Sequence, residues 1–192
     1  MSDTVDRTEV LNTYTTDMAA VEGHIATALG HQLDSDELRP FADAQTVIRR
    51  LKTTLEGHVA KLEAYNDETE GGGLKEALKD AVGTALGVAA GLYDRVRPND
   101  TASRMIRDTY TATSLATISY HMLYTTALGL KSERVASMAL ANLKELTPFV
   151  MDLSETVCRV VAQELENEDK VYTDSIAEKA VKMTQTAWQP SS

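Results

Sequence analysis

A short phrase that combines an acid with an imidazole occurs twice in this sequence. Glu22-Gly23-His24-Ile25-Ala26 returns as Glu56-Gly57-His58-Val59-Ala60. Carboxylate and imidazole side chains are ligands for iron, manganese and zinc, and they also form polar pairs inside proteins. Each phrase lies midway along an apolar pattern that is typical of an amphipathic helix. The chemistry open to these residues therefore depends on how two helices pack.

The acid and the histidine of one phrase cannot bind the same ion, because residues two apart on a helix point about 200° from each other. His58 falls on the apolar seam of its helix, Glu56 faces outward, and Glu22 flanks the seam of the first helix. We therefore predict that Glu22 and His58 meet across the interface of these two helices. The alternative to a metal site is a buried histidine that is hydrogen-bonded to a carboxylate or a threonine.

The elements that position these residues form a first helix pair over residues 6–65. The apolar spacing predicts one helix from about Asp6 to His31 and a second from about Phe41 to Tyr65. Residues 66–73, which end in three glycines, are predicted to be a linker.

The segment 74–97 has a different composition, with glycines four residues apart at Gly83, Gly87 and Gly91. Such a ladder lets two helix backbones approach closely. We expect this helix to pack within its own subunit or against a second one. An amphipathic helix lying on a membrane is the alternative, since the apolar stretch is too short to span a bilayer.

A second helix pair is predicted over residues 100–166. Asp100 and Ser132 are suitable N-caps, and Gly129 is a suitable C-cap for the first of these helices. Pro148 lies inside the second helix, where we expect a kink or a local break. A short C-terminal helix is predicted within an arm over residues 170–188, which Trp188 is suited to dock onto the bundle or onto a partner.

A stripe of hydroxyl side chains follows one side of the helix that starts near residue 100. Its members are Tyr110, Thr113, Thr117, Tyr120 and Tyr124. A row of hydroxyls facing the centre of a bundle would line a small polar cavity or a radical path. The structural alternative, which we favour, is a helix interface whose hydroxyls bond backbone carbonyls or other helices.

Composition and periodicity together predict an all-α protein of one domain. The chain has 192 residues, a formal net charge of −10 and a single cysteine, Cys158, and it lacks alternating apolar and polar runs. The acidity argues against nucleic acid and anionic lipid as main partners. The lone cysteine, the polar N-terminus and the absence of a long apolar stretch predict a cytoplasmic protein.

Several short segments resemble the ferritin-like superfamily, and within it the small bacterial stress proteins of the YciE/YciF type. The matching segments are 20–22, 58–63, 120–123, 127–129 and 143–145, within residues 10–65 and 100–155. The resemblance implies an antiparallel four-helix bundle with a di-metal centre between the helices, here with an extra glycine-rich helix between the two pairs. It implies Glu22, His58 and Glu145 as the metal ligands, with iron or another divalent transition metal as the candidate ion.

The sequence also departs from the pattern of that family. A di-iron carboxylate site takes a Glu from each of two helices and Glu-x-x-His from each of the other two, and no Glu-x-x-His occurs in this chain. Thr53 and Thr54 stand where helix 2 of the family carries its carboxylates, and no glutamate lies between Thr101 and Lys131. The departures leave a redox di-iron centre short of ligands, and no cofactor is firmly predicted.

The leading prediction for function is therefore non-catalytic, a structural or stress-associated protein that acts through self-association as a homo-oligomer. The glycine ladder, the acidic surface and the C-terminal tryptophan motivate it. The first alternative is a ferritin-like protein that binds iron for storage or detoxification. The second is a peripheral membrane protein that binds through residues 74–97.

Overall fold

The computed structural model describes residues 6–70, 101–168, 170 and 175–188. The helices are α1 (Arg7–Leu33), α2 (Ala42–Glu70), α4 (Ala102–Gly129), α5 (Glu133–Asn167) and α6 (Ile176–Thr186). Within these residues there is no strand, so the predicted all-α class is confirmed. None of the described helices is both long and apolar enough to cross a membrane.

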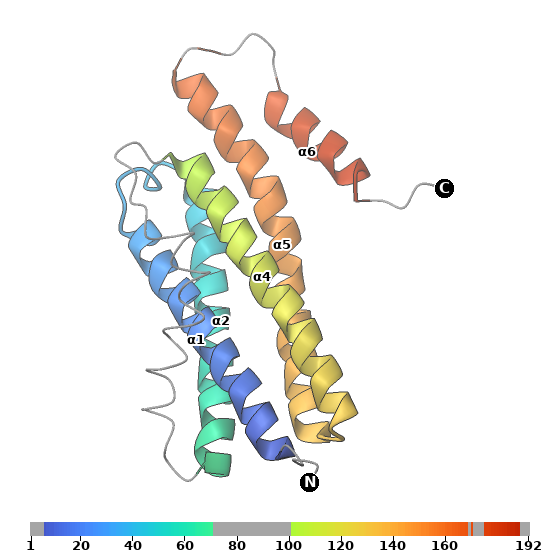
Figure 1. Cartoon of the computed structure of the whole chain (residues 1–192). Coiled ribbons are helices and arrows are strands. Elements are labelled where there is room, and N and C mark those ends of the chain that lie inside the picture. The colour runs from blue at the N-terminus through green and yellow to red at the C-terminus, as the bar shows by residue number, and fades with distance from the viewer. Residues whose placement is uncertain (1–5, 71–100, 169, 171–174, 189–192) are drawn as a thin grey trace.

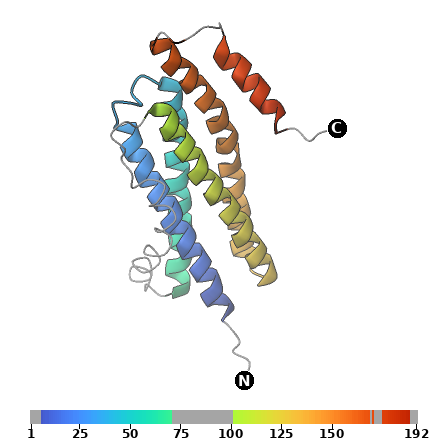
Figure 2. The same cartoon turned by 45° about the horizontal axis from the view of Figure 1, so that its top comes forward.

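Four long helices surround one apolar core (Figures 1 and 2). α1 and α2 form one antiparallel pair, and α4 and α5 form the other. The two pairs meet where α4 lies on α1 and where α5 lies on α2, while α6 packs on α5. α2 and α4 run in the same direction, and α1 and α5 run in the opposite one (Figure 1). Each of the four helices therefore presents one side to a shared interior.

The seam of α5 follows a seven-residue repeat, which explains why one side of this helix is buried along its whole length. The buried residues alternate in steps of three and four: Ala139, Asn142, Leu146, Phe149, Leu153, Thr156 and Val160. The seam of α2 has the same spacing and includes His58 as predicted; its buried residues are Ile48, Leu51, Leu55, His58, Leu62 and Tyr65. A polar residue at a seam position, such as Asn142 or His58, must therefore find its partner inside the protein.

The C-cap residue of α4, in the turn before α5, is not the predicted one. Gly129 is the last residue of α4, and Leu130 is its C-cap. The left-handed residue is Lys131, with φ of 58°. The amide of Lys131 bonds the carbonyl of Leu128, and that of Ser132 bonds the carbonyl of Ala127, which is the Schellman pattern. Ser132 then caps α5 as predicted, because its hydroxyl accepts from the amide of Val135.

The predicted linker over residues 66–73 is wrong for its first five residues, which continue α2 to Glu70. Asn66 explains the difference, because its side chain is fully buried against α1. Its carboxamide accepts from the hydroxyl of Thr15 and donates to that of Thr16. Thr69 adds a hydrogen bond of 2.9 Å to Asn12. These contacts fix the last turns of α2 in place.

A kink or a local break was predicted at Pro148, and the break is absent, because α5 runs unbroken from Glu133 to Asn167. Leu146 and Phe149, on either side of the proline, are buried in the core and hold the helix there. Thr101 is the N-cap of α4, while Asp100 lies outside the described residues. Within the predicted arm over 170–188, the predicted short helix is α6, Ile176–Thr186.

Two further predictions concern the docking of Trp188 and the glycine-rich segment 74–97. α6 rests on α5 through Val181, which is buried, whereas Trp188 is 53% exposed. The segment 74–97, with Gly83, Gly87 and Gly91, lies outside the described residues. Its predicted helix and its packing therefore stay predictions.

Candidate functional site

The structure brings together the three residues that the sequence singled out as metal ligands. Glu22 comes from α1, His58 from α2 and Glu145 from α5. Nδ1 of His58 lies 3.1 Å from Oε1 of Glu22, and Nε2 of the same ring lies 3.2 Å from Oε2 of Glu145. The imidazole therefore stands between the two carboxylates and contacts one with each of its nitrogens.

Three more polar side chains complete this cluster, which we call the Glu22–His58 network. The hydroxyl of Tyr120 donates to Oε2 of Glu22 at 2.8 Å and accepts from Nδ2 of Asn142 at 2.9 Å. Nζ of Lys61 lies 3.4 Å from both Oε1 of Glu145 and Oδ1 of Asn142. All four long helices thus contribute at least one member.

The network lies mostly in the interior. The side chains of Glu22, His58, Tyr120 and Asn142 are fully buried, or nearly so, whereas that of Glu145 is 51% exposed. The ring of Tyr120 meets the ring of His58 edge to face, with centroids 5.9 Å apart. Because buried polar groups without partners are costly, the completeness of these hydrogen bonds is what allows such residues in an apolar core.

The surroundings shift the pKa values of the acids in opposite directions. Burial raises the pKa of Glu22, although His58 and Tyr120 oppose the rise. Burial also acts to raise the pKa of Glu145, but the hydrogen bond from His58 and the charge of Lys61 outweigh it and hold that pKa below its usual value. The pKa of Tyr120 is raised by burial and by the adjacent charge of Glu22, so this phenol keeps its proton and donates it.

The hydrogen-bond geometry, together with the lowered pKa of Glu145, indicates where the protons of the network lie. Glu145 is ionised at neutral pH and can only accept, so Nε2 of His58 must carry a hydrogen and donate it. Nδ1 of His58 and Oε1 of Glu22 face each other at 3.1 Å, which requires one proton between them. That proton belongs to the pair, whether it is drawn on the imidazole or on the carboxyl.

The network is electrically neutral with this arrangement of protons. Lys61 supplies one positive charge and Glu145 one negative charge, and the pair of Glu22 and His58 with its shared proton sums to zero. No further cation is needed to balance the buried acid. Each oxygen of Glu22 and each nitrogen of His58 already has a partner within the chain.

The geometry also separates the three predicted ligands. Glu22 and Glu145 lie at different edges of the same imidazole, so one ion cannot take both carboxylates together with one nitrogen of His58. Among the described residues, no group of three or more His, Cys, Asp or Glu side chains is placed to hold a metal ion. To bind there, a metal would have to displace a proton and rearrange at least one side chain.

The two copies of the repeated Glu-Gly-His segment contribute different residues to the network. The network takes the acid of the first copy and the histidine of the second. Glu56, the acid of the second copy, is exposed and pairs with Lys52 one helical turn away. His24 is partly buried and lies outside the network.

The residues of the hydroxyl stripe of α4 make three kinds of contact. The hydroxyls of Thr113 and Thr117 donate to backbone carbonyls one turn back, at 2.8 and 2.7 Å. Tyr120 instead reaches across to Glu22 on α1. Tyr110 and Tyr124 are partly buried against the apolar core. This pattern agrees with the interpretation of the stripe as a helix interface.

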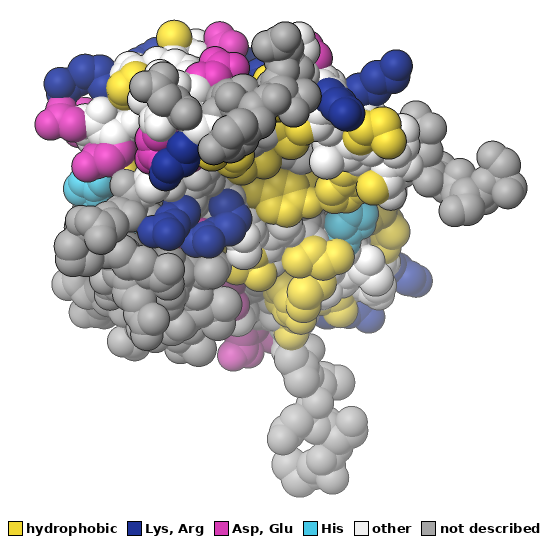
Figure 3. Space-filling model, turned by 90° about the horizontal axis from the view of Figure 1, so that it is seen from above, with side chains coloured by type: hydrophobic (Ala, Val, Ile, Leu, Met, Phe, Trp, Pro, Cys, Tyr) yellow, Lys and Arg dark blue, Asp and Glu magenta, His cyan; other side chains and the backbone are white. Residues whose placement is uncertain are grey.

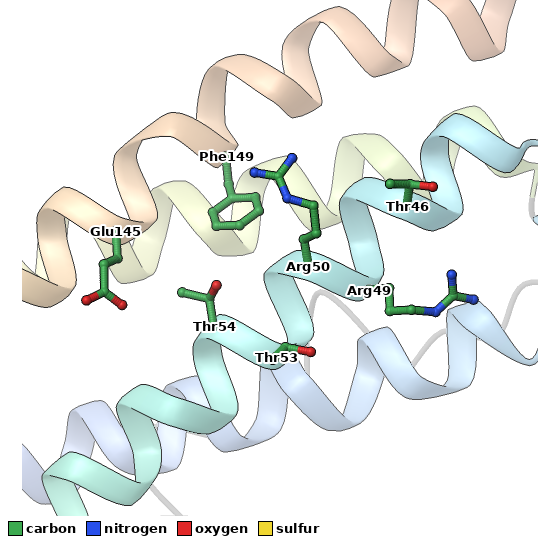
Figure 4. A pocket seen from close by; sticks show the side chains of 7 residues that line it. All are labelled: Thr46, Arg49, Arg50, Thr53, Thr54, Glu145 and Phe149. Atoms are coloured by element: carbon green, nitrogen blue, oxygen red, sulfur yellow. The ribbon is translucent and has the colours of Figure 1, made fainter.

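A surface groove between α2 and α5 leads to the exposed end of the network (Figure 4). It has a volume of about 540 Å³, and Glu145 lies at one end of its lining. Toward the other end, the guanidinium of Arg50 lies 5.4 Å from the ring centroid of Phe149 and 3.5 Å from Asp152. Glu145 is therefore the member through which the buried network meets solvent.

The lining of this groove includes Thr53 and Thr54, the two residues that stand where helix 2 of the ferritin-like family carries its carboxylates. Thr53 and Thr54 line this surface groove rather than the interior. The residue three positions before His58, where a Glu-x-x-His pair would carry its acid, is Leu55, and it is fully buried. At that position α2 therefore presents a core leucine and no carboxylate.

Two members of the network were not found from the sequence, Asn142 and Lys61. Asn142 occupies a seam position of α5 between Ala139 and Leu146, and a lone amide in an apolar seven-residue repeat is a signal that could have identified it. Lys61 follows His58 by three residues, so the two share one side of α2. No feature of the sequence predicts the contact of Lys61 with Glu145.

Comparisons of this chain with protein-family models, with curated proteins and with solved structures found no match. The resemblance to ferritin-like proteins stays a prediction from the sequence.

Proposed function

We propose that this protein is a non-catalytic, ferritin-like four-helix bundle of the stress-associated kind, which acts through self-association. The observation that carries the non-catalytic part is the neutrality of the Glu22–His58 network. A metal centre needs acids whose charge is balanced by the ion, whereas here Lys61 and the shared proton balance Glu145 and Glu22. On this proposal the network sets the register of the four helices.

The course of the chain supports the ferritin-like part of the proposal. α2 and α4 run in the same direction (Figure 1), so the stretch between them connects opposite ends of two parallel helices. A bundle with one long crossover between its second and third helices is the arrangement of ferritin-like folds. The predicted glycine-rich helix belongs to that crossover, at residues 74–97.

Exposed apolar side chains support self-association. Six large ones are exposed among the described residues: Ile118, Met122, Leu128, Val161, Met183 and Trp188. Figure 3 shows hydrophobic side chains gathered near the middle of the face seen from above, with lysine and arginine side chains beside them and further charged side chains around the edge. Contiguous apolar surface on a folded domain is a feature of interaction sites.

Sedimentation velocity of the full chain, over a wide range of concentration, tests this proposal. We expect a reversible dimer or a larger oligomer whose population grows with concentration. A strictly monomeric protein at the highest concentration would contradict self-association.

One observation favours a second candidate function, the binding of iron or another divalent transition metal. Glu22, His58 and Glu145 lie in one series of contacts although they come from three helices. Anaerobic loading with ferrous iron, manganese and zinc, followed by measurement of bound metal, tests this candidate. One ion per chain in the parent, lost in a folded His58→Gln variant but kept in Glu56→Gln, would support it.

A further inference from the structure

Lys61 places its ammonium group against two oxygen atoms of the Glu22–His58 network. It follows His58 by three positions, so the two side chains share one side of α2. Nζ of Lys61 reaches across to α5, where it lies 3.4 Å from Oε1 of Glu145 and 3.4 Å from Oδ1 of Asn142. One cationic group therefore contacts a carboxylate oxygen and an amide oxygen that come from the same turn of the neighbouring helix.

Both oxygens depend on this ammonium for a donor. Asn142 is fully buried, and its Nδ2 donates to the hydroxyl of Tyr120, so Lys61 is the donor that its Oδ1 has among the described residues. In Glu145, Oε2 faces the ring of His58 and Oε1 faces Lys61. An unpaired buried acceptor is costly. Lys61 thus satisfies the amide oxygen and balances the charge of the carboxylate.

The other charged side chains near this end of the groove do not share that role. Arg50 pairs with Asp152 at 3.5 Å. Arg49 lines the groove and Lys144 precedes Glu145 in the sequence, and both are exposed. Among the described residues, neither of these two makes an ion pair with Glu145, whose ion-pair partners are His58 and Lys61.

A divalent metal ion would use the same two oxygens. Carboxylate and amide carbonyl oxygens are ligands for manganese, magnesium and calcium, and the groove gives solvent access to Glu145. The chain has a net charge of −10, so its surface attracts cations. An ammonium group a few ångströms from such an ion weakens its binding by roughly 10-fold or more, even with the effective dielectric constant near a protein surface.

We propose that Lys61 is a built-in cation that keeps divalent metal ions out of the network, because its ammonium fills the place between Glu145 and Asn142. In place of the metal centre that the ferritin-like resemblance implies, the network holds a positive charge that belongs to the chain. This inference rests on the non-catalytic function proposed above and assigns the exclusion of metal to one side chain. It predicts that an ion site opens when this charge is removed.

Manganese binding to the full chain tests the role of the charge. Lys61→Ala removes the ammonium at a position that is 47% exposed and leaves both oxygens in place. Lys52→Ala is the matched control, because it removes another lysine of α2 that pairs with a glutamate, Glu56. Electron paramagnetic resonance measures free manganese at neutral pH. We expect Lys61→Ala to bind one ion per chain on the order of 10-fold or more tightly than the parent or Lys52→Ala does.

Three further measurements locate the ion and isolate the effect of charge. Glu145→Gln, added to Lys61→Ala, should abolish the gained binding, and Lys61→Arg, which keeps the positive charge, should exclude manganese as the parent does. In Lys61→Ala, manganese should broaden the NMR signals of the His58 ring before those of His31, which is exposed on α1. Gained binding that survives Glu145→Gln, or that also occurs in Lys61→Arg, would overturn the inference.

The outcomes separate this inference from the proposed function. A parent that binds manganese at the network as tightly as Lys61→Ala would overturn both and favour the metal-binding candidate. A parent without bound manganese, together with a folded Lys61→Ala that binds no more tightly, would overturn the inference alone. Circular dichroism checks the fold, and Lys61→Gln, which removes the charge but keeps a hydrogen-bond donor, repeats the test if Lys61→Ala is not folded.

Discussion

The phenolic oxygen of Tyr120 lies 2.8 Å from Oε2 of Glu22, although the two residues are separated by nearly one hundred positions in the chain. This hydrogen bond joins the two helix pairs at their centre, because Glu22 belongs to α1 and Tyr120 to α4. It also occupies the one oxygen of Glu22 that His58 leaves open. The buried carboxyl group is thereby fully hydrogen-bonded within the chain.

Removal of the phenolic hydroxyl should destabilise the protein without a large change in packing. Tyr120→Phe leaves Oε2 of Glu22 and Nδ2 of Asn142 without their shared partner. We expect the free energy of unfolding to fall by about 1–3 kcal/mol, the cost of unpaired buried polar groups. Urea denaturation measures it. Tyr124→Phe, on the same helix, should change the free energy by less than about 0.5 kcal/mol; equal effects of the two would contradict the role of Tyr120.

The two glutamates of the repeated phrase should differ strongly in their contribution to stability. Glu22→Ala breaks a buried pair and leaves His58 and Tyr120 without their acceptor, for which we expect a loss of about 3 kcal/mol or more. Glu56→Ala removes only an exposed pair with Lys52, which is worth roughly 0.5 kcal/mol. Thermal and urea denaturation of both variants provide the comparison. A loss from Glu56→Ala as large as that from Glu22→Ala would count against the network.

The contribution of Glu145 should depend on pH. The pKa of this carboxyl is held below its usual value of 4.5 in the folded protein. Its ionised form therefore contributes stability that is fully present above pH 4.5 and is lost as the pH falls through the lowered pKa. We expect Glu145→Gln to cost roughly 1 kcal/mol at neutral pH and progressively less below pH 4.5. Denaturation of parent and variant at several pH values measures the difference, and a constant difference down to the lowest pH would contradict the assignment.

The end of α2 should depend on Asn66. Asn66→Ala removes the buried amide that bonds Thr15 and Thr16, and we expect a loss of about 1–3 kcal/mol. Backbone amides of residues 67–69 should also lose their protection from hydrogen exchange. The neighbouring exposed residue gives the control, since Asp67→Ala should leave both quantities nearly unchanged. Normal protection in Asn66→Ala would show that another contact holds these turns.

Helical periodicity was sufficient to predict the class of the fold and the seam of α2, because apolar spacing directly reflects burial. The end of α2 could not be predicted, because asparagine is a residue type that is typical of linkers. Asn66 is held in the helix by hydrogen bonds to Thr15 and Thr16 of α1, which lie about fifty residues earlier in the sequence. The continuity of α5 across Pro148 could not be predicted either, since it goes with the burial of Leu146 and Phe149 on both sides of the proline.

The candidate site was predictable in part. The seam position of His58 and the flanking position of Glu22 were enough to predict that the two residues meet, and they lie 3.1 Å apart. The resemblance implied that Glu145 lies near the pair. The direct contact of each imidazole nitrogen with one carboxylate could not be predicted, because it depends on the relative position of α2 and α5. The same is true of Lys61, whose contact with Glu145 depends on the packing of those two helices.

We infer that the Glu22–His58 network holds protons where a metal site would have bare ligands. The most direct test is nitrogen-15 NMR of the His58 ring at neutral pH, assigned with a His58→Gln variant and repeated after addition of zinc. We predict that Nε2 carries a hydrogen-bonded proton that exchanges slowly with water and that zinc leaves its signal unchanged. A bare Nε2, or an Nε2 proton that zinc displaces at one ion per chain, would contradict the claim and identify the site as a metal centre.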